Sequence, residues 1–119
     1  MNVELLEKVK QHILEEPKRL RMGTILHTNA KERGWDNTPV CNTVGCIAGW
    51  TCVLGGSPAV RAHSSIARDL LDVTHEQGER LFFSYPDGFE HIFDDDGSEE
   101  TAKLVAKRID LFIKTNGEE

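Results

Sequence analysis

No apolar run in this sequence approaches the roughly 20 residues that are needed to cross a bilayer. Residues 1–16 mix charged and apolar side chains, and they lack the basic and then apolar segments of a signal peptide. Cysteine is scarce, and its count of three is odd, which argues against a secreted disulfide framework. These absences predict a cytoplasmic protein with no membrane partner, whose cysteines are thiols.

Motifs of catalysis and metal binding are missing or incomplete. In residues 75–79, His-Glu-Gln-Gly-Glu, a glutamate stands where a metalloprotease needs its second histidine. Residues 94–97 look like part of a calcium loop, but Ile92 and Lys103 then occupy positions that require Asp and Glu. There is no Gly-x-Ser-x-Gly motif and no Gly-rich phosphate loop. We therefore assign no catalytic residue and expect no metal ion or cofactor.

The charge is acidic overall and unevenly distributed. The net charge is −6; residues 1–33 carry seven basic and five acidic side chains, whereas the rest carry seven and fifteen. Because phosphate binding depends on Lys and Arg, this balance disfavours nucleic acid as a partner. The opposite charges of the two parts would also suit a homodimer, which we weigh as a weaker alternative.

Length and helix signals together predict the fold class. A chain of 119 residues suits one domain, residues 1–119, with a single core. Start and stop signals predict an all-α domain of about four to six helices, with one short hairpin allowed within 27–40 or 83–93. The signals are the caps Asn2, Ser57 before Pro58, Thr74 with Gln77, and Ser98, the stop at Glu16 before Pro17, and the ends at Gly55–Gly56 and Asn116–Gly117.

The longest uncharged stretch, residues 38–60, predicts a buried central helix over residues 44–54. Thr43 is a suitable N-cap, and Ile47 and Trp50 begin an apolar stripe. Gly45 and Gly49 each cost about 1 kcal/mol in a helix relative to alanine, so their presence predicts that another backbone packs closely there. The structural residues of this motif are thus Thr43, Gly45, Gly49 and Trp50.

Cys41 and Cys46 form a candidate thiol site at the start of the predicted helix. A cysteine in the first turn of a helix has a lowered pKa, which favours the reactive thiolate. The alternatives are a disulfide, a metal site and simple packing, since free cysteine behaves as a small buried hydrophobe. The Cys-x4-Cys spacing lacks the second ligand pair that structural zinc needs. We favour packing and leave the other interpretations open.

Residues 41–50, Cys-Asn-Thr-Val-Gly-Cys-Ile-Ala-Gly-Trp, resemble a motif of small uncharacterised bacterial and phage proteins, roughly Cys-Gly-Thr-x-x-Cys-Ile-Ala-Gly-Trp. Asn42 stands where the pattern has glycine, and asparagine tolerates positive φ better than most residues. The resemblance extends to residues 13–17, 22–24, 70–74, 81–82 and 109–113. It implies a bacterial or phage origin and one folded unit, and it carries no activity with it.

Three hypotheses for the function follow. The first is a small cytoplasmic, non-enzymatic binding or regulatory protein, whose protein or small-molecule partner the sequence does not identify. The second is a thiol-based enzyme or redox switch that uses Cys46 with Cys41. The third is a zinc-stabilised interaction module.

Overall fold

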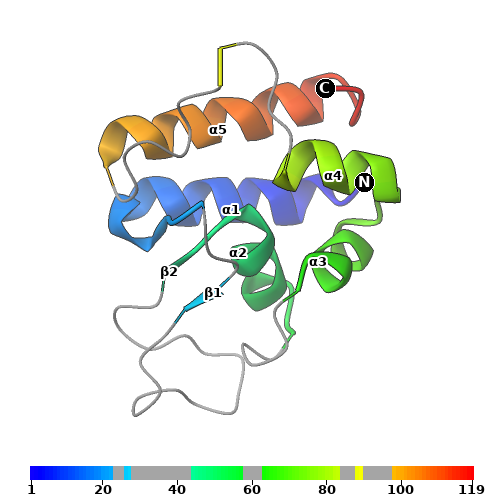
Figure 1. Cartoon of the computed structure of the whole chain (residues 1–119), viewed down its shortest axis with the longest axis horizontal. Helices are drawn as coiled ribbons and strands as arrows, with labels where there is room; N and C mark the ends of the chain where they lie inside the picture. Colours follow the sequence, from blue (N-terminus) through cyan, green and yellow to red (C-terminus); the bar gives the residue numbers. More distant parts are fainter. Residues whose placement is uncertain (23–25, 28–43, 58–62, 84–87, 90–97) are drawn as a thin grey trace.

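The computed structural model describes residues 1–22, 26–27, 44–57, 63–83, 88–89 and 98–119. Over these residues the chain is a small all-α domain of five α-helices, as the sequence predicts, with one 3₁₀ turn and two very short strands (Figure 1). The elements are α1 (Val3–Glu15), η1 (Pro17–Arg19), β1 (Leu26–His27), β2 (Val44–Gly45), α2 (Ile47–Leu54), α3 (Ser64–Leu71), α4 (His75–Phe82) and α5 (Glu99–Lys114).

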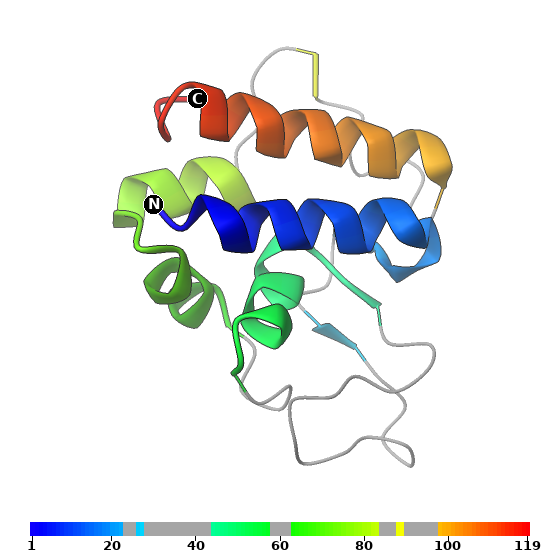
Figure 2. The same cartoon turned by 180° about the vertical axis from the view of Figure 1, so that it is seen from behind.

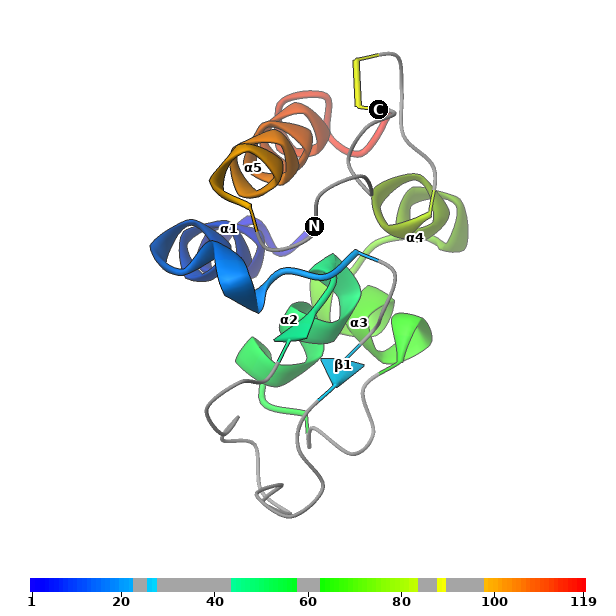
Figure 3. The ribbon, with the colours of Figure 1, turned by 60° about the vertical axis from the view of Figure 1, so that its left-hand side comes forward.

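Helix α1 lies between the other elements. The last helix, α5, runs antiparallel beside it on one side, and α2 and α3 pack on the other (Figures 1 and 2). An ion pair between Lys10 Nζ and Asp110 Oδ1, 2.7 Å long, joins α1 to α5. Helix α4 packs against α2, α3 and α5 (Figure 3). The two ends of the described chain are therefore held together by one helix pair.

Apolar side chains from all five helices form one core. Helix α2 is buried from Ile47 to Val53, which confirms the prediction of a buried central helix. Arg108 of α5 is also fully buried, and its Nη2 donates a hydrogen bond to the carbonyl oxygen of Arg80 at 2.9 Å. The largest fully buried apolar side chains are Trp50, Phe112, Leu6, Ile13, Leu20, Ile47, Leu71, Leu81, Ile109 and Val9.

Several helix ends follow the local signals of the sequence. The Asn2 side chain accepts a hydrogen bond from the Leu5 amide at 3.1 Å and caps α1, and this helix ends before Pro17. Ser98 caps α5 through the Thr101 amide. After α5, Asn116 and Gly117 both adopt positive φ, of 53° and 83°.

Helix α4 begins with the predicted capping box. The Thr74 hydroxyl accepts from the Gln77 amide at 3.1 Å, and the Gln77 side chain accepts from the Thr74 amide at 2.9 Å. Replacing Thr74 with alanine should lower the free energy of unfolding by about 1 kcal/mol, because it leaves the Gln77 amide without its acceptor. Urea denaturation measures this loss. The control Thr74→Ser keeps the hydroxyl and should stay near wild type; an equal loss in both variants would contradict the capping role.

The central helix starts later than residue 44. Helix α2 begins at Ile47, and Cys46, with extended backbone angles, is its N-cap. Val44 and Gly45 instead form β2, antiparallel to β1, with Leu26 opposite Gly45 and His27 opposite Val44. Gly45 also bridges to Leu20. The predicted start is therefore wrong, because strand pairing takes the backbone groups that a helix would use.

Other predictions need correction or lie outside the described residues. Helix α3 begins at Ser64, and its N-cap His63 has extended backbone angles, so the predicted helix does not run unbroken from Ser57 into α3. Residues 58–62, where that helix was expected to start, lie outside the described residues. The observed strand pair only touches the expected hairpin range of residues 27–40: β1 ends at His27, and β2 begins at Val44, beyond that range. The predicted cap Thr43, the thiol Cys41 and the calcium-like residues 94–97 lie outside the described residues.

Candidate functional site

Two of the three cysteines lie in the described part of the chain, and both are buried. Cys46, at the N-cap of α2, is 6% exposed, and Cys52, two turns further on, is fully buried. The Cys52 thiol donates a hydrogen bond to the carbonyl oxygen of His63 at 3.3 Å. Whether Cys46 pairs with Cys41 stays a prediction, because Cys41 lies outside the described residues.

Burial sets the protonation of these thiols. It raises the pKa of Cys46 above the ordinary value, although the backbone amides of Gly49 and Ala48 act in the opposite direction. Burial likewise raises the pKa of Cys52. The expected lowering at Cys46 is therefore wrong: loss of hydration outweighs the favourable helix start. In this structure both groups pack as small apolar side chains.

The other structural residues of the central motif have clear positions where they are described. Gly45 lies in β2, outside the helix, and its carbonyl oxygen accepts a hydrogen bond from the Arg21 amide at 2.9 Å. Gly49 is buried within α2. Trp50 is 1% exposed, and its Nε1 donates to the carbonyl oxygen of Arg19 at 2.9 Å. Through these two hydrogen bonds, the motif connects η1 and the residues that follow it to β2 and α2.

The described residues do not gather three His, Cys, Asp or Glu side chains closely enough to hold a metal ion. His75, from the incomplete metalloprotease motif, is exposed. Its Nδ1 lies 2.8 Å from Nη1 of Arg68, and its Nε2 lies 3.9 Å from Oε1 of Glu79.

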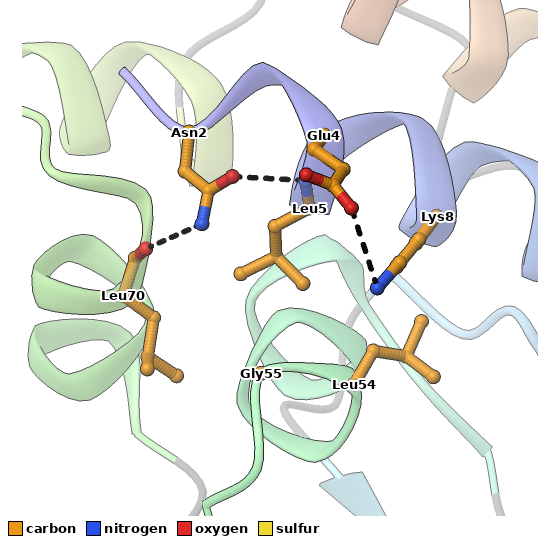
Figure 4. A pocket seen from close by; sticks show the side chains of 7 residues that line it. All are labelled: Asn2, Glu4, Leu5, Lys8, Leu54, Gly55 and Leu70. Atoms are coloured by element: carbon orange, nitrogen blue, oxygen red, sulfur yellow. Dashed lines mark hydrogen bonds and ion pairs between the residues drawn. The ribbon is translucent and has the colours of Figure 1, made fainter.

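A pocket of about 250 Å³ lies where α1, α2 and α3 meet (Figure 4). Each helix contributes one leucine to its lining: Leu5 from α1, Leu54 from α2 and Leu70 from α3. Helix α1 also contributes the ion pair between Glu4 and Lys8, 3.8 Å apart, whose side chains are 85% and 62% exposed. The pocket therefore brings three leucines together with one charge of each sign, and its lining as a whole is more polar than apolar.

Two small features bring the three helices together around this pocket. The Asn2 side chain caps α1 and also donates a hydrogen bond to the carbonyl oxygen of Leu70 at 3.3 Å (Figure 4). A Cβ atom at Gly55 would lie 2.8 Å from Leu70 Cδ1 and 3.3 Å from Leu5 Cδ2. Glycine at the end of α2 thus allows the leucines of α1 and α3 to approach it.

The sequence contained parts of this pocket, but no motif connected them. Asn2 is recognisable as a cap and Gly55 as a helix end, and the Glu4–Lys8 spacing is that of an ordinary stabilising pair on a helix. Their convergence depends on the packing of α1 against α2 and α3, which no local pattern encodes.

No protein-family model, no curated protein and no solved structure matches this chain. Within the described residues, none of the helices combines the length and the apolar character that a membrane span requires.

Proposed function

We propose that this chain is a small cytoplasmic, non-enzymatic binding protein, and that its pocket between α1, α2 and α3 receives one apolar side chain of a partner protein. The observation that carries the proposal is the pocket itself, which has leucines from three helices and an exposed ion pair along α1. The raised pKa of Cys46 and Cys52 supports binding over thiol catalysis.

The size of the pocket favours a side chain over a larger ligand. Pockets for drug-sized molecules are typically about 300–1,000 Å³, and this one has a volume of about 250 Å³. A leucine or methionine that enters it would contact Leu5, Leu54 and Leu70. The Glu4–Lys8 pair is exposed, and such pairs contribute only about 0–1 kcal/mol. Both charges can therefore pair with charges of a partner at little cost.

Selection from a displayed library of random nine-residue peptides tests the proposal. We expect the selected peptides to share one aliphatic residue flanked by charged residues. Leu54→Trp should fill the pocket and weaken their binding about tenfold or more, as loss of a buried side-chain contact worth about 1.5–3 kcal/mol implies. The control Leu14→Trp places the same bulk on an exposed position of α1, outside the pocket lining, and should leave binding unchanged.

The double variant Glu4→Lys with Lys8→Glu sharpens this test. It keeps an ion pair at the same spacing but exchanges the two charges, so the order of charged residues in the selected peptides should reverse. Native mass measurement of the same samples separates peptide binding from self-association. A selection that returns no Leu54-dependent peptide, or a dimer that uses this pocket, would overturn the proposal.

A further inference from the structure

His12, in the last turn of α1, lies between the arginine of η1 and the tryptophan of α2. Its ring packs on Trp50, with 4.4 Å between the ring centroids and 60° between the planes. Nη1 of Arg19 lies 3.2 Å from Nδ1 of His12 and donates to the His12 carbonyl oxygen at 3.0 Å. The Trp50 indole in turn donates to the Arg19 carbonyl oxygen. The three residues therefore form a closed cluster across α1, η1 and α2.

This geometry determines which ring nitrogen carries the proton. A guanidinium group can only donate hydrogen bonds, so Nδ1 of His12 must accept from Arg19 and is unprotonated. The proton of the neutral ring then lies on Nε2. This atom is buried and has no hydrogen-bond partner among the described residues. A second proton, on Nδ1, would replace the hydrogen bond with two cations 3.2 Å apart.

We propose that His12 is a proton-sensitive latch: its neutral ring holds residues 16–22 against the start of α2, and its protonation releases them. The released segment would include two backbone contacts to β2, namely the Arg21 amide bonded to the Gly45 carbonyl oxygen at 2.9 Å and the Leu20–Gly45 bridge. Because Cys46 follows Gly45 directly and is 6% exposed, we expect release to increase the exposure of its side chain. This function is separate from the pocket and does not depend on it.

The surroundings of His12 favour its neutral form. Burial lowers the pKa of His12, and the charge of Arg19 lowers it further, while Glu15 and Glu16 act in the opposite direction. Both glutamates form ion pairs with Arg19, Glu15 at 3.8 Å and Glu16 at 3.4 Å. Because their charge is partly balanced by Arg19, they stabilise a protonated His12 less. Helix α2 contributes no charged side chain, since Ile47–Leu54 contains none.

The direction of the pH dependence follows from the lowered pKa. Above the ordinary histidine pKa of 6.5, the neutral ring contributes its full stability to the latched state. This contribution is lost as the pH falls through 6.5 toward the lower pKa of the latched protein. Each pKa unit between the released and latched states corresponds to about a tenfold change in the population of the released state.

Protection of individual thiols against 4,4′-dithiodipyridine measures the release. At each pH, the protection factor of a cysteine is its labelling rate in urea divided by its labelling rate in the native protein. Peptide mass spectrometry distinguishes the sites. Between pH 7.5 and 5, the protection factor of Cys46 should fall about tenfold for each unit by which the pKa of His12 differs between the released and latched states. The protection factor of Cys52, in the core, should stay high. Equal loss at both cysteines would indicate global unfolding and overturn the latch.

Two matched variants isolate the role of His12. His12→Asn keeps an acceptor near the position of Nδ1, and His12→Phe keeps the ring on Trp50; neither can gain the proton. In both, the protection of Cys46 should become independent of pH. His75→Asn removes a similar contact with Arg68 in an exposed setting and should retain the wild-type profile. Imidazole ¹⁵N shifts provide a second readout, and a proton on Nδ1 of His12 at pH 7.5, or an unchanged profile in both His12 variants, would refute the proposal.

Discussion

Replacing Trp50 with alanine should lower the free energy of unfolding by about 3–5 kcal/mol, the usual cost of removing a large buried aromatic side chain. Trp50 is 1% exposed, and it packs on His12 while its indole donates to the Arg19 carbonyl oxygen. Its loss opens a cavity beside α1 and also removes the hydrogen bond that fixes η1. Since domains of this size have a total stability of about 5–15 kcal/mol, the variant should be close to unfolding. Urea denaturation followed by far-UV circular dichroism measures the change.

The variant Trp50→Phe separates packing from hydrogen bonding. Phenylalanine keeps most of the ring surface but cannot donate to Arg19, so its cost should be well below that of alanine, with about 1–3 kcal/mol attributable to the unsatisfied carbonyl oxygen. If the two variants lose equal stability, then the hydrogen bond and not the ring is the main contribution. If alanine costs under about 1 kcal/mol, the assignment of Trp50 to the core is wrong.

Phe112→Ala should cost a similar amount, about 3–5 kcal/mol. Phe112 is fully buried on α5, and the guanidinium carbon of Arg108 lies 5.9 Å from the centroid of its ring. Truncation would remove apolar contacts and also the aromatic face beside a buried cation. Because Arg108 donates to the Arg80 carbonyl oxygen, the damage should extend to the packing of α4. Chemical denaturation gives the stability, and amide exchange in α4 gives the second effect.

Phe112→Leu is the matched control for this prediction. Leucine restores most of the apolar volume without the aromatic face, so it should recover more than half of the loss in stability. An exposed apolar position, Leu14→Ala on α1, should change stability by less than about 1 kcal/mol. A Phe112→Ala protein as stable as Leu14→Ala would show that α5 does not pack in the described way.

The helix ends that could be predicted from the sequence depend on contacts within a few residues. Asn2, Thr74 and Ser98 each bond to an amide three residues away, and Pro17 acts on the residue before it. Such contacts join residues that are close together in the sequence, so local patterns predict them. The all-α class follows from the same signals, because each amphipathic segment between caps has one face to bury.

The start of α2 and the chemistry of Cys46 could not be predicted in the same way. Val44 and Gly45 join a strand pair with His27 and Leu26, which lie 17 and 19 residues away in the sequence. The pKa of Cys46 is raised by burial, and burial depends on residues from distant parts of the chain. Such distant contacts cannot be recognised from local patterns in a single sequence. Local helix geometry alone therefore predicted a lowered pKa for Cys46, whereas burial raises it.

The candidate sites were hidden for a related reason. The pocket combines residues near 2–8, 54–55 and 70, and the latch combines residues 12, 19 and 50. Each residue has an ordinary local role, as a cap, a helix end or part of an apolar stripe. Their joint chemistry arises only when α1 is packed on α2. This explains why the sequence suggested a site only at the cysteines and left the binding hypothesis without one.

The pairing of the first and last helices has a consequence for biosynthesis. Lys10 and Asp110 form a contact that spans 100 residues, and α1 buries one side against α5. A ribosome makes about 5–20 residues per second, so α1 waits at least several seconds before its neighbour is translated. During that interval Leu6, Val9 and Ile13 lack part of their native cover. The packing of α1 is therefore completed only after α5 has been synthesised.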